Sequence, residues 1–365
     1  MRPTNRVSTF AIACSLLALG ACTTSDRAAA PAAMAVKPLY AVPTQLPTNV
    51  RPVHYSISAV PDAANLSFGA TTYIDVDVVE ATDEITLNAA DLTFGAVTLT
   101  DTRGTTVPAR ETRLDADKQT ATFEFADAIA PGRYRLSTNY SGKIGTQAAG
   151  LFALDYPSAD GSGEKRALFT QFQAPDARRF FPGWDEPQFR TPYDLRVTVP
   201  SSQMAVSNMP QKTRVDNGNG TSTVTFATSP PMSSYLLFVG AGEFDRITTT
   251  AGGTEIGVIA KKGDGEKGRY ALEGSAQIVP YYNDYFGTPY PLPKLDNIAG
   301  PGSSQFFSAM ENWGAIFSFE DILLVDPKIT TEATRQGIFG VAAHEIAHQW
   351  FGNLVTMAWW DDLWL

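Results

Sequence analysis

Two histidines and a glutamate lie within five residues near the end of the chain, in the segment His344-Glu345-Ile346-Ala347-His348. On a helix, residues four apart project from one face, so both imidazoles would point at a single ion. Neutral imidazole nitrogens suit zinc, which lowers the pKa of a bound water to about 7. The pattern predicts one Zn2+ per chain, with His344 and His348 as ligands and Glu345 as the general base. The alternative is an ordinary amphipathic helix with two satisfied histidines.

A second segment with candidate chemistry, SAMENWG over residues 308–314, ends 30 residues before His344 on an expected strand. It resembles the G-A-M-E-N exopeptidase signature of aminopeptidase N-like zinc metallopeptidases, peptidase family M1. Three further segments are similar to that family: residues 171–187 (QFQAPDARRFFPGWDEP), 290–296 (YPLPKLD) and 344–365 (HEIAHQWFGNLVTMAWWDDLWL). The resemblance covers about residues 45–365 and implies a metallo-aminopeptidase, a hydrolase that acts on peptides with a free N-terminus.

The resemblance also implies roles for individual residues. His344 and His348 would be the zinc ligands and Glu345 the general base. Glu311 would bind the α-ammonium of the substrate, because a buried carboxylate recognises an ammonium group and leaves an internal amide unpaired. The other substrate-binding residues implied are Gln173, as a second amine-binding group, and Ser308, Ala309, Met310 and Asn312. The backbone of Ala309 and Met310 would pair with the peptide as an added strand.

A catalytic zinc site of this class uses three protein ligands. The resemblance places the third, a Glu, 19 residues after His348 at position 367, beyond Leu365. We therefore expect residues 1–365 to be an N-terminal fragment that binds zinc weakly and is inactive by itself. Two alternatives stay open. One is a catalytically dead, lipid-anchored protein that binds peptides; the other is a zincin-type endopeptidase, which predicts no Glu311 signature.

The elements that must position these residues follow a change of pattern along the chain. Short alternating runs between turn residues predict an all-β domain, with runs at 72–79, 84–87, 120–125, 133–140, 194–199, 222–227 and 235–239. After a run at 255–259, residues 270–286 have helical spacing, residues 305–325 are rich in strand formers, and a helix over 331–351 would end at Gly352-Asn353.

These patterns predict a multidomain fold, β and then α+β. We expect an N-terminal all-β domain over residues 48–246 and, over residues 247–365, the start of a catalytic domain. The resemblance implies a saddle-like or sandwich arrangement for the first domain. It implies a truncated, thermolysin-like zinc-metallopeptidase domain for the second.

The first 22 residues have the features of a bacterial lipoprotein signal. Arg2 and Arg6 precede an apolar run that is too short to span a membrane, and the run ends Leu19-Gly20-Ala21-Cys22, similar to a lipobox. We expect a signal peptide over 1–21, lipid attachment at Cys22 and an Ala/Pro-rich tether over 22–47. The lipid would anchor the protein in the bacterial cell envelope, at the outer membrane facing the periplasm. A plain secretory signal is the alternative.

Composition limits the other classes of function. Hydrophobic residues make up 44% of the chain, which is typical of globular protein. The formal charge of -10 disfavours binding to nucleic acid. Both cysteines, Cys14 and Cys22, lie in the first 22 residues, so the folded part has no internal disulfide and no cysteine zinc site.

Overall fold

The computed structural model describes residues 44–304 and 307–363. The predicted signal peptide, the lipid site at Cys22 and most of the tether lie outside the described residues. Val42–Leu365 forms one compact unit. Among the described helices, none combines the length and the apolar character that a membrane crossing requires.

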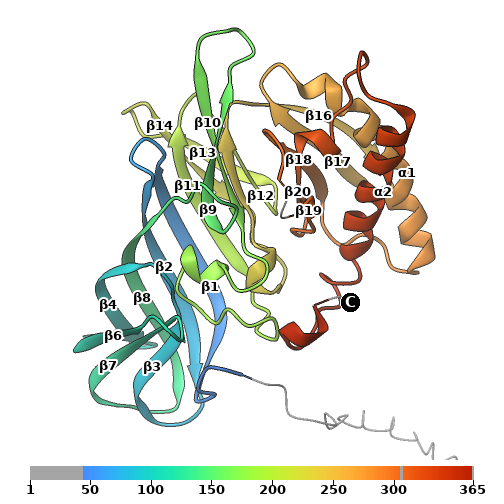
Figure 1. Cartoon of the computed structure of the whole chain (residues 1–365). Helices are drawn as coiled ribbons and strands as arrows, with labels where there is room; N and C mark the ends of the chain where they lie inside the picture. The colour runs from blue at the N-terminus through green and yellow to red at the C-terminus, as the bar shows by residue number, and fades with distance from the viewer. Residues whose placement is uncertain (1–43, 305–306, 364–365) are drawn as a thin grey trace, which may run out of the picture. The chain divides into compact units, whose positions relative to one another are not determined.

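An N-terminal β-sheet domain is built from strands β1 to β15 in three sheets (Figure 1). The eight-stranded sheet has the order β13-β14-β11-β1-β2-β8-β4-β5, the three-stranded sheet β3-β7-β6 and the four-stranded sheet β12-β15-β10-β9. Their bounds are β1 Val50–Asp62, β2 Ser67–Val78, β3 Thr82–Asn88, β4 Thr93–Asp101, β5 Thr106–Pro108, β6 Glu111–Asp115, β7 Thr120–Ile129, β8 Gly132–Lys143, β9 Gly150–Pro157, β10 Glu164–Gln171, β11 Tyr193–Pro200, β12 Met204–Ser207, β13 Gln211–Asp216, β14 Thr221–Phe226 and β15 Val239–Gly242.

Alternation in the sequence becomes alternation of burial in these strands. In β2, Ile74, Val76 and Val78 are buried, whereas the residues between them are more exposed. A strand in which every second side chain is apolar can place one face against a core and the other toward water. The alternating runs predicted from 72 to 227 are confirmed as strands, with ends that differ by a few residues.

The strand predicted over residues 235–239 is wrong in most of its length. A short 3-10 helix occupies Ser234–Leu236, and β15 begins only at Val239. The Ser234 hydroxyl donates to the buried Asp185 carboxylate at 2.6 Å, and the Ser233 hydroxyl donates to the Pro187 carbonyl at 2.5 Å. These side-chain hydrogen bonds hold a turn where the apolar sequence alone indicated an extended strand.

An α+β region follows the β-sheet domain. Its five-stranded sheet has the order β16-β17-β18-β20-β19, and its elements are β16 Phe244–Ala251, β17 Thr254–Lys261, α1 Arg269–Tyr285, β18 Lys294–Gly300, β19 Ala309–Met310, β20 Ala315–Phe319 and α2 Glu332–His348. Helix α1 packs against β16, β17 and α2, as Figure 1 shows on the orange and red side of the molecule. The predicted order, β and then α+β, is confirmed.

Helix α2 is the element that carries the two histidines. It begins after Thr331, whose hydroxyl accepts a hydrogen bond from the Thr334 amide at 3.2 Å, as an N-cap residue does. It ends at His348, three residues before the predicted end at Phe351. The chain turns back at Gly352, which has a φ of +135°, and the Asn353 amide donates to the His348 carbonyl at 3.0 Å. Glycine and asparagine therefore end the helix as predicted, although the last turn tightens before them.

Candidate active site

His344 and His348 lie one turn apart on α2, and their side chains converge. The two Nε2 atoms are 3.2 Å apart, and the ring planes are at 87° to each other. His348 Nδ1 lies 3.0 Å from the Phe351 carbonyl oxygen. A proton on that Nδ1 leaves the Nε2 lone pair directed toward His344. Burial, with the His348 charge, lowers the pKa of His344, which favours the neutral imidazole that a metal ligand must be.

Two carboxylates lie beside the imidazoles. Glu345 is buried, and its Oε2 has no hydrogen-bond partner among the described residues. Burial and the neighbouring Glu311 charge raise the pKa of Glu345 to about 8. Burial also raises the pKa of Glu311, and the His348 charge acts in the opposite direction. The backbone agrees with these mutual effects, because Gln349 Nε2 donates to the carbonyls of both Glu311, at 3.0 Å, and Glu345, at 3.2 Å, and so joins the segment after β19 to the end of α2.

The strand before Glu311 is at the edge of its sheet. Ala309 and Met310 form β19, which pairs antiparallel with β20 and is the last strand in the order of the sheet. The Ser308 carbonyl continues this pairing, because it accepts from the Phe319 amide at 3.3 Å. An edge strand presents unpaired backbone groups to which an extended peptide can add as a further strand. The edge position of β19 suits the predicted backbone pairing of Ala309 and Met310 with a substrate.

Asn312 and Gln173 have different surroundings. Asn312 is fully buried, and neither atom of its side-chain amide has a hydrogen-bond partner among the described residues. Gln173 is half-buried in the loop after β10, and no hydrogen bond joins it to Glu311 in the described part of the chain. The structure thus brings together His344, His348, Glu345 and Glu311, whereas the substrate-binding roles of Gln173 and Asn312 stay predictions.

The donor set at α2 fits part of a zinc site. Two neutral imidazole nitrogens that face one point are ligands that zinc prefers, and the buried carboxylate without a partner adds a polar group beside them. Within residues 44–304 and 307–363, no cluster of three or more His, Cys, Asp or Glu side chains is arranged to hold a metal ion. The described residues therefore provide two of the three protein ligands that a catalytic zinc uses.

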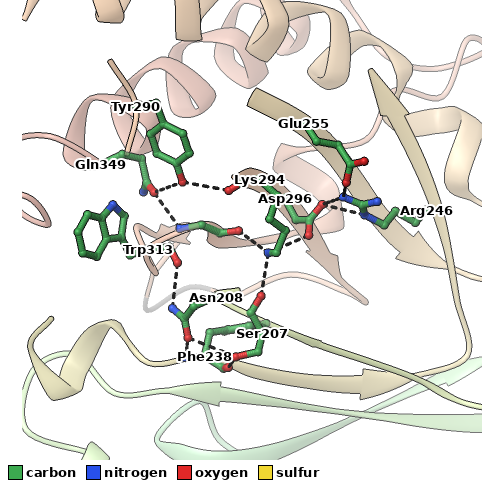
Figure 2. Close-up of polar contacts among 11 residues, drawn as sticks. Ser207, Asn208, Phe238, Arg246, Glu255, Tyr290, Lys294, Asp296, Trp313 and Gln349 are labelled. Carbon is green, nitrogen blue, oxygen red and sulfur yellow. Dashed lines mark hydrogen bonds and ion pairs between the residues drawn. The ribbon is translucent and has the colours of Figure 1, made fainter. Parts of the chain in front are cut away.

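Four residues for which the sequence predicted no role at the site connect it to the rest of the fold. Gln349 and Asn353 donate hydrogen bonds to the Glu311 carbonyl, at 3.0 and 2.7 Å. Lys294 and Asn208 bind the backbone of the residues that follow Glu311 (Figure 2). Lys294 could have been recognised as unusual, because it is a charged residue at the start of β18, a strand whose residues are all buried, and a buried lysine needs partners.

Comparison with known proteins agrees with this geometry. The Peptidase M1 N-terminal domain family matches residues 51–236, and the Peptidase family M1 domain matches residues 270–365. The chain belongs to peptidase family M1. The first match covers most of the β-sheet domain, and the second contains all but the first residue of α1, together with β18, β19, β20, α2 and all four clustered site residues.

Members of the family from distant organisms are similar to this chain. It is 44% identical over 321 residues to Aminopeptidase N of Acetobacter pasteurianus, a match that covers 88% of each sequence. It is 38% identical over 323 residues to Puromycin-sensitive aminopeptidase of Caenorhabditis elegans and 36% identical over 326 residues to Aminopeptidase M1 of Arabidopsis thaliana. Those two matches cover 88% of this chain but 34% and 36% of the relatives, so the chain spans about a third of their length.

Proposed function

We propose that the protein is a zinc-dependent aminopeptidase that releases N-terminal residues from peptides. The observation that carries the proposal is the convergence of the His344 and His348 imidazoles next to Glu311, which directly follows the edge strand β19. Membership of family M1 and homology to aminopeptidases support the same conclusion. They favour it over an endopeptidase, which has no need of a carboxylate that recognises a chain end.

In this proposal each site residue has its own role. Glu311 binds the α-ammonium group of the peptide, and the backbone of β19 holds the following residue in an extended conformation. His344 and His348 would hold zinc, together with a third ligand that the described residues do not include. When bound, the zinc ion supplies a Lewis acid that polarises the scissile carbonyl group and acidifies a water molecule. With the cation bound, Glu345 would be ionised, and its carboxylate would act as the general base that takes a proton from the attacking water and returns it to the leaving amine.

The test compares one peptide with a free and with an acetylated N-terminus, using the complete natural protein loaded with zinc. We expect hydrolysis of the free peptide only, because the acetylated end cannot pair with Glu311. The Glu345→Gln variant should lose activity by a factor on the order of 100 or more while it keeps its zinc. Equal rates on both peptides would contradict the exopeptidase assignment. Peptide binding without hydrolysis would favour the catalytically dead binding protein.

We also propose that the protein is a lipoprotein of the bacterial cell envelope, attached through Cys22 at the outer membrane and facing the periplasm. The support is the sequence before Cys22, with its two arginines, short apolar run and Leu-Gly-Ala ending. Mass spectrometry of the mature N-terminal peptide should find Cys22 as the first residue, carrying a diacylglyceryl group. A mature protein that begins elsewhere and carries no lipid would refute this proposal.

A further inference from the structure

The backbone on the C-terminal side of Glu311 is held by side chains from three separate parts of the fold. We call the side chains of Asn208, Lys294, Gln349 and Asn353 the backbone clamp. All four residues are buried. They bind the carbonyl groups of Glu311, Trp313 and Gly314 and the amide of Gly314, and Figure 2 shows most of these contacts around the short segment after β19.

Gln349 is the central member of the clamp, because its amide group binds two backbone positions of this segment. Its Nε2 donates to the Glu311 carbonyl at 3.0 Å, and its Oε1 accepts from the Gly314 amide at 3.0 Å. Nε2 also donates to the Glu345 carbonyl at 3.2 Å. Gln349 directly follows His348 in the chain. One side chain therefore joins the helix that carries the imidazoles to the segment that carries the Glu311 carboxylate.

The opposite side of the segment is attached to the β-sheet domain. Asn208 Nδ2 donates to the Trp313 carbonyl at 3.0 Å and to the Leu236 carbonyl at 2.7 Å. Lys294 Nζ donates to the carbonyls of Gly314, at 2.7 Å, and Ser207, at 2.8 Å. Each of these two side chains thus links the segment after Glu311 to the region around β12 and β15.

We propose that Gln349 is a positioning residue for substrate amine recognition: it sets the distance between the Glu311 carboxylate and the imidazoles of α2, while Asn208 and Lys294 hold the segment from the other side. This proposal rests on the proposed aminopeptidase function. The spacing matters because an aminopeptidase must hold the amine and the scissile carbonyl a fixed distance apart. A displacement of about 1 Å at such a site can lower the rate on the order of 100-fold.

The experiment compares the Gln349→Met variant with the unmodified protein, both complete and loaded with zinc. It measures how strongly each prefers a peptide with a free N-terminal amine over the acetylated peptide. Methionine has nearly the volume of glutamine but makes neither hydrogen bond to the segment. We expect kcat/KM for a free peptide to fall on the order of 100-fold. In the Glu345→Gln background, where peptides bind without turnover, we expect the preference for the free over the acetylated peptide to fall at least about tenfold. Zinc content should stay at the level of the unmodified protein.

The control is Gln336→Met, at an exposed position on the same helix, which should leave zinc content and selectivity unchanged.

If Gln349→Met does not fold, the Asn353→Ser variant is the test. It removes only the 2.7 Å hydrogen bond to the Glu311 carbonyl and should weaken selectivity in the same direction. A folded variant with unchanged selectivity overturns the positioning role. A variant that loses zinc in parallel with selectivity also overturns it, because the side chain would then act on His348. If the protein that keeps Gln349 binds the free and the acetylated peptide equally well, this proposal and the aminopeptidase function are overturned together.

Discussion

Replacing Lys294 with methionine tests how the α+β region is attached to the β-sheet domain. The Lys294 ammonium group is buried and lies 2.9 Å from the Asp296 carboxylate, in addition to its two carbonyl contacts. Burial lowers the pKa of Lys294, although the Asp296 charge opposes this shift. Desolvation therefore outweighs the ion pair, and the loss of stability must come from the partners that the substitution leaves without a donor.

The size of the effect follows from those partners. Removing one member of a buried ion pair usually costs about 3–5 kcal/mol. Asp296 keeps Arg246, whose Nε and Nη2 lie 2.9 and 2.8 Å from its Oδ1, so the lower end of that range applies. The Gly314 carbonyl also keeps the Asp296 amide as a donor, at 3.1 Å. We expect the free energy of unfolding to fall by about 3 kcal/mol. For a compact unit of this size, with an unfolding entropy of about 2.1 cal/mol/K per residue, this lowers Tm by roughly 4–5 °C.

Lys118→Met is the matched control. Lys118 also pairs with an aspartate, Asp115, at 3.2 Å, but 78% of its side chain is exposed, compared with 7% for Lys294. An exposed pair of this kind contributes less than about 1 kcal/mol. Urea unfolding followed by circular dichroism should separate the two variants clearly. If Lys294→Met loses no more stability than Lys118→Met, the Lys294 contacts do not hold the segment in place and our reasoning about the attachment is wrong.

Three further predictions concern a turn, a surface pair and the metal. Gly314→Ala should destabilise the protein by at least about 2 kcal/mol in a thermal unfolding assay, since Gly314 has a φ of +79° and a Cβ there would lie 2.5 Å from the Asn208 carbonyl oxygen; an unchanged Tm would contradict this. The Arg166 guanidinium lowers the pKa of Asp155 below its usual 3.8, so the pair adds stability above that pH and loses it as the pH falls through the lowered pKa. The stability difference between the protein and Asp155→Asn should therefore be at most about 1 kcal/mol at neutral pH and should disappear in acid; a difference that grows in acid would refute it. Residues 1–365 alone should lose zinc during gel filtration, because two imidazoles hold the ion without a third described ligand, and one tightly retained zinc per chain would show that another ligand is present.

Local patterns in the sequence predicted the parts of the site that depend on local geometry. The two imidazoles converge because four residues make about one turn of helix, and this holds wherever the helix lies in the fold. Six strands of the β-sheet domain (β2, β3, β7, β8, β11 and β14) were also predictable, since buried side chains largely alternate along them. The placement of Glu311 next to α2 was expected from the family resemblance, because nothing in its own segment specifies a neighbour more than 30 residues away.

Spacing could not predict the residues that fix the site in three dimensions. Asn208 binds the carbonyl of a residue 105 positions away, and Lys294 binds one that lies 87 positions away. Both contacts go to backbone groups, which every residue possesses, so no residue type at the other end marks the partner. The strand predicted over 235–239 failed for a similar reason, because hydroxyl groups of neighbouring serines bind distant acceptors and hold a turn there.

The position of Gln349 in the chain has a mechanical consequence. Because the residue that grips the segment after Glu311 is the immediate neighbour of His348, tilting or sliding of the end of α2 carries the carboxylate along with the imidazole. Thermal motion of the helix therefore displaces both halves of the site together and changes their separation little.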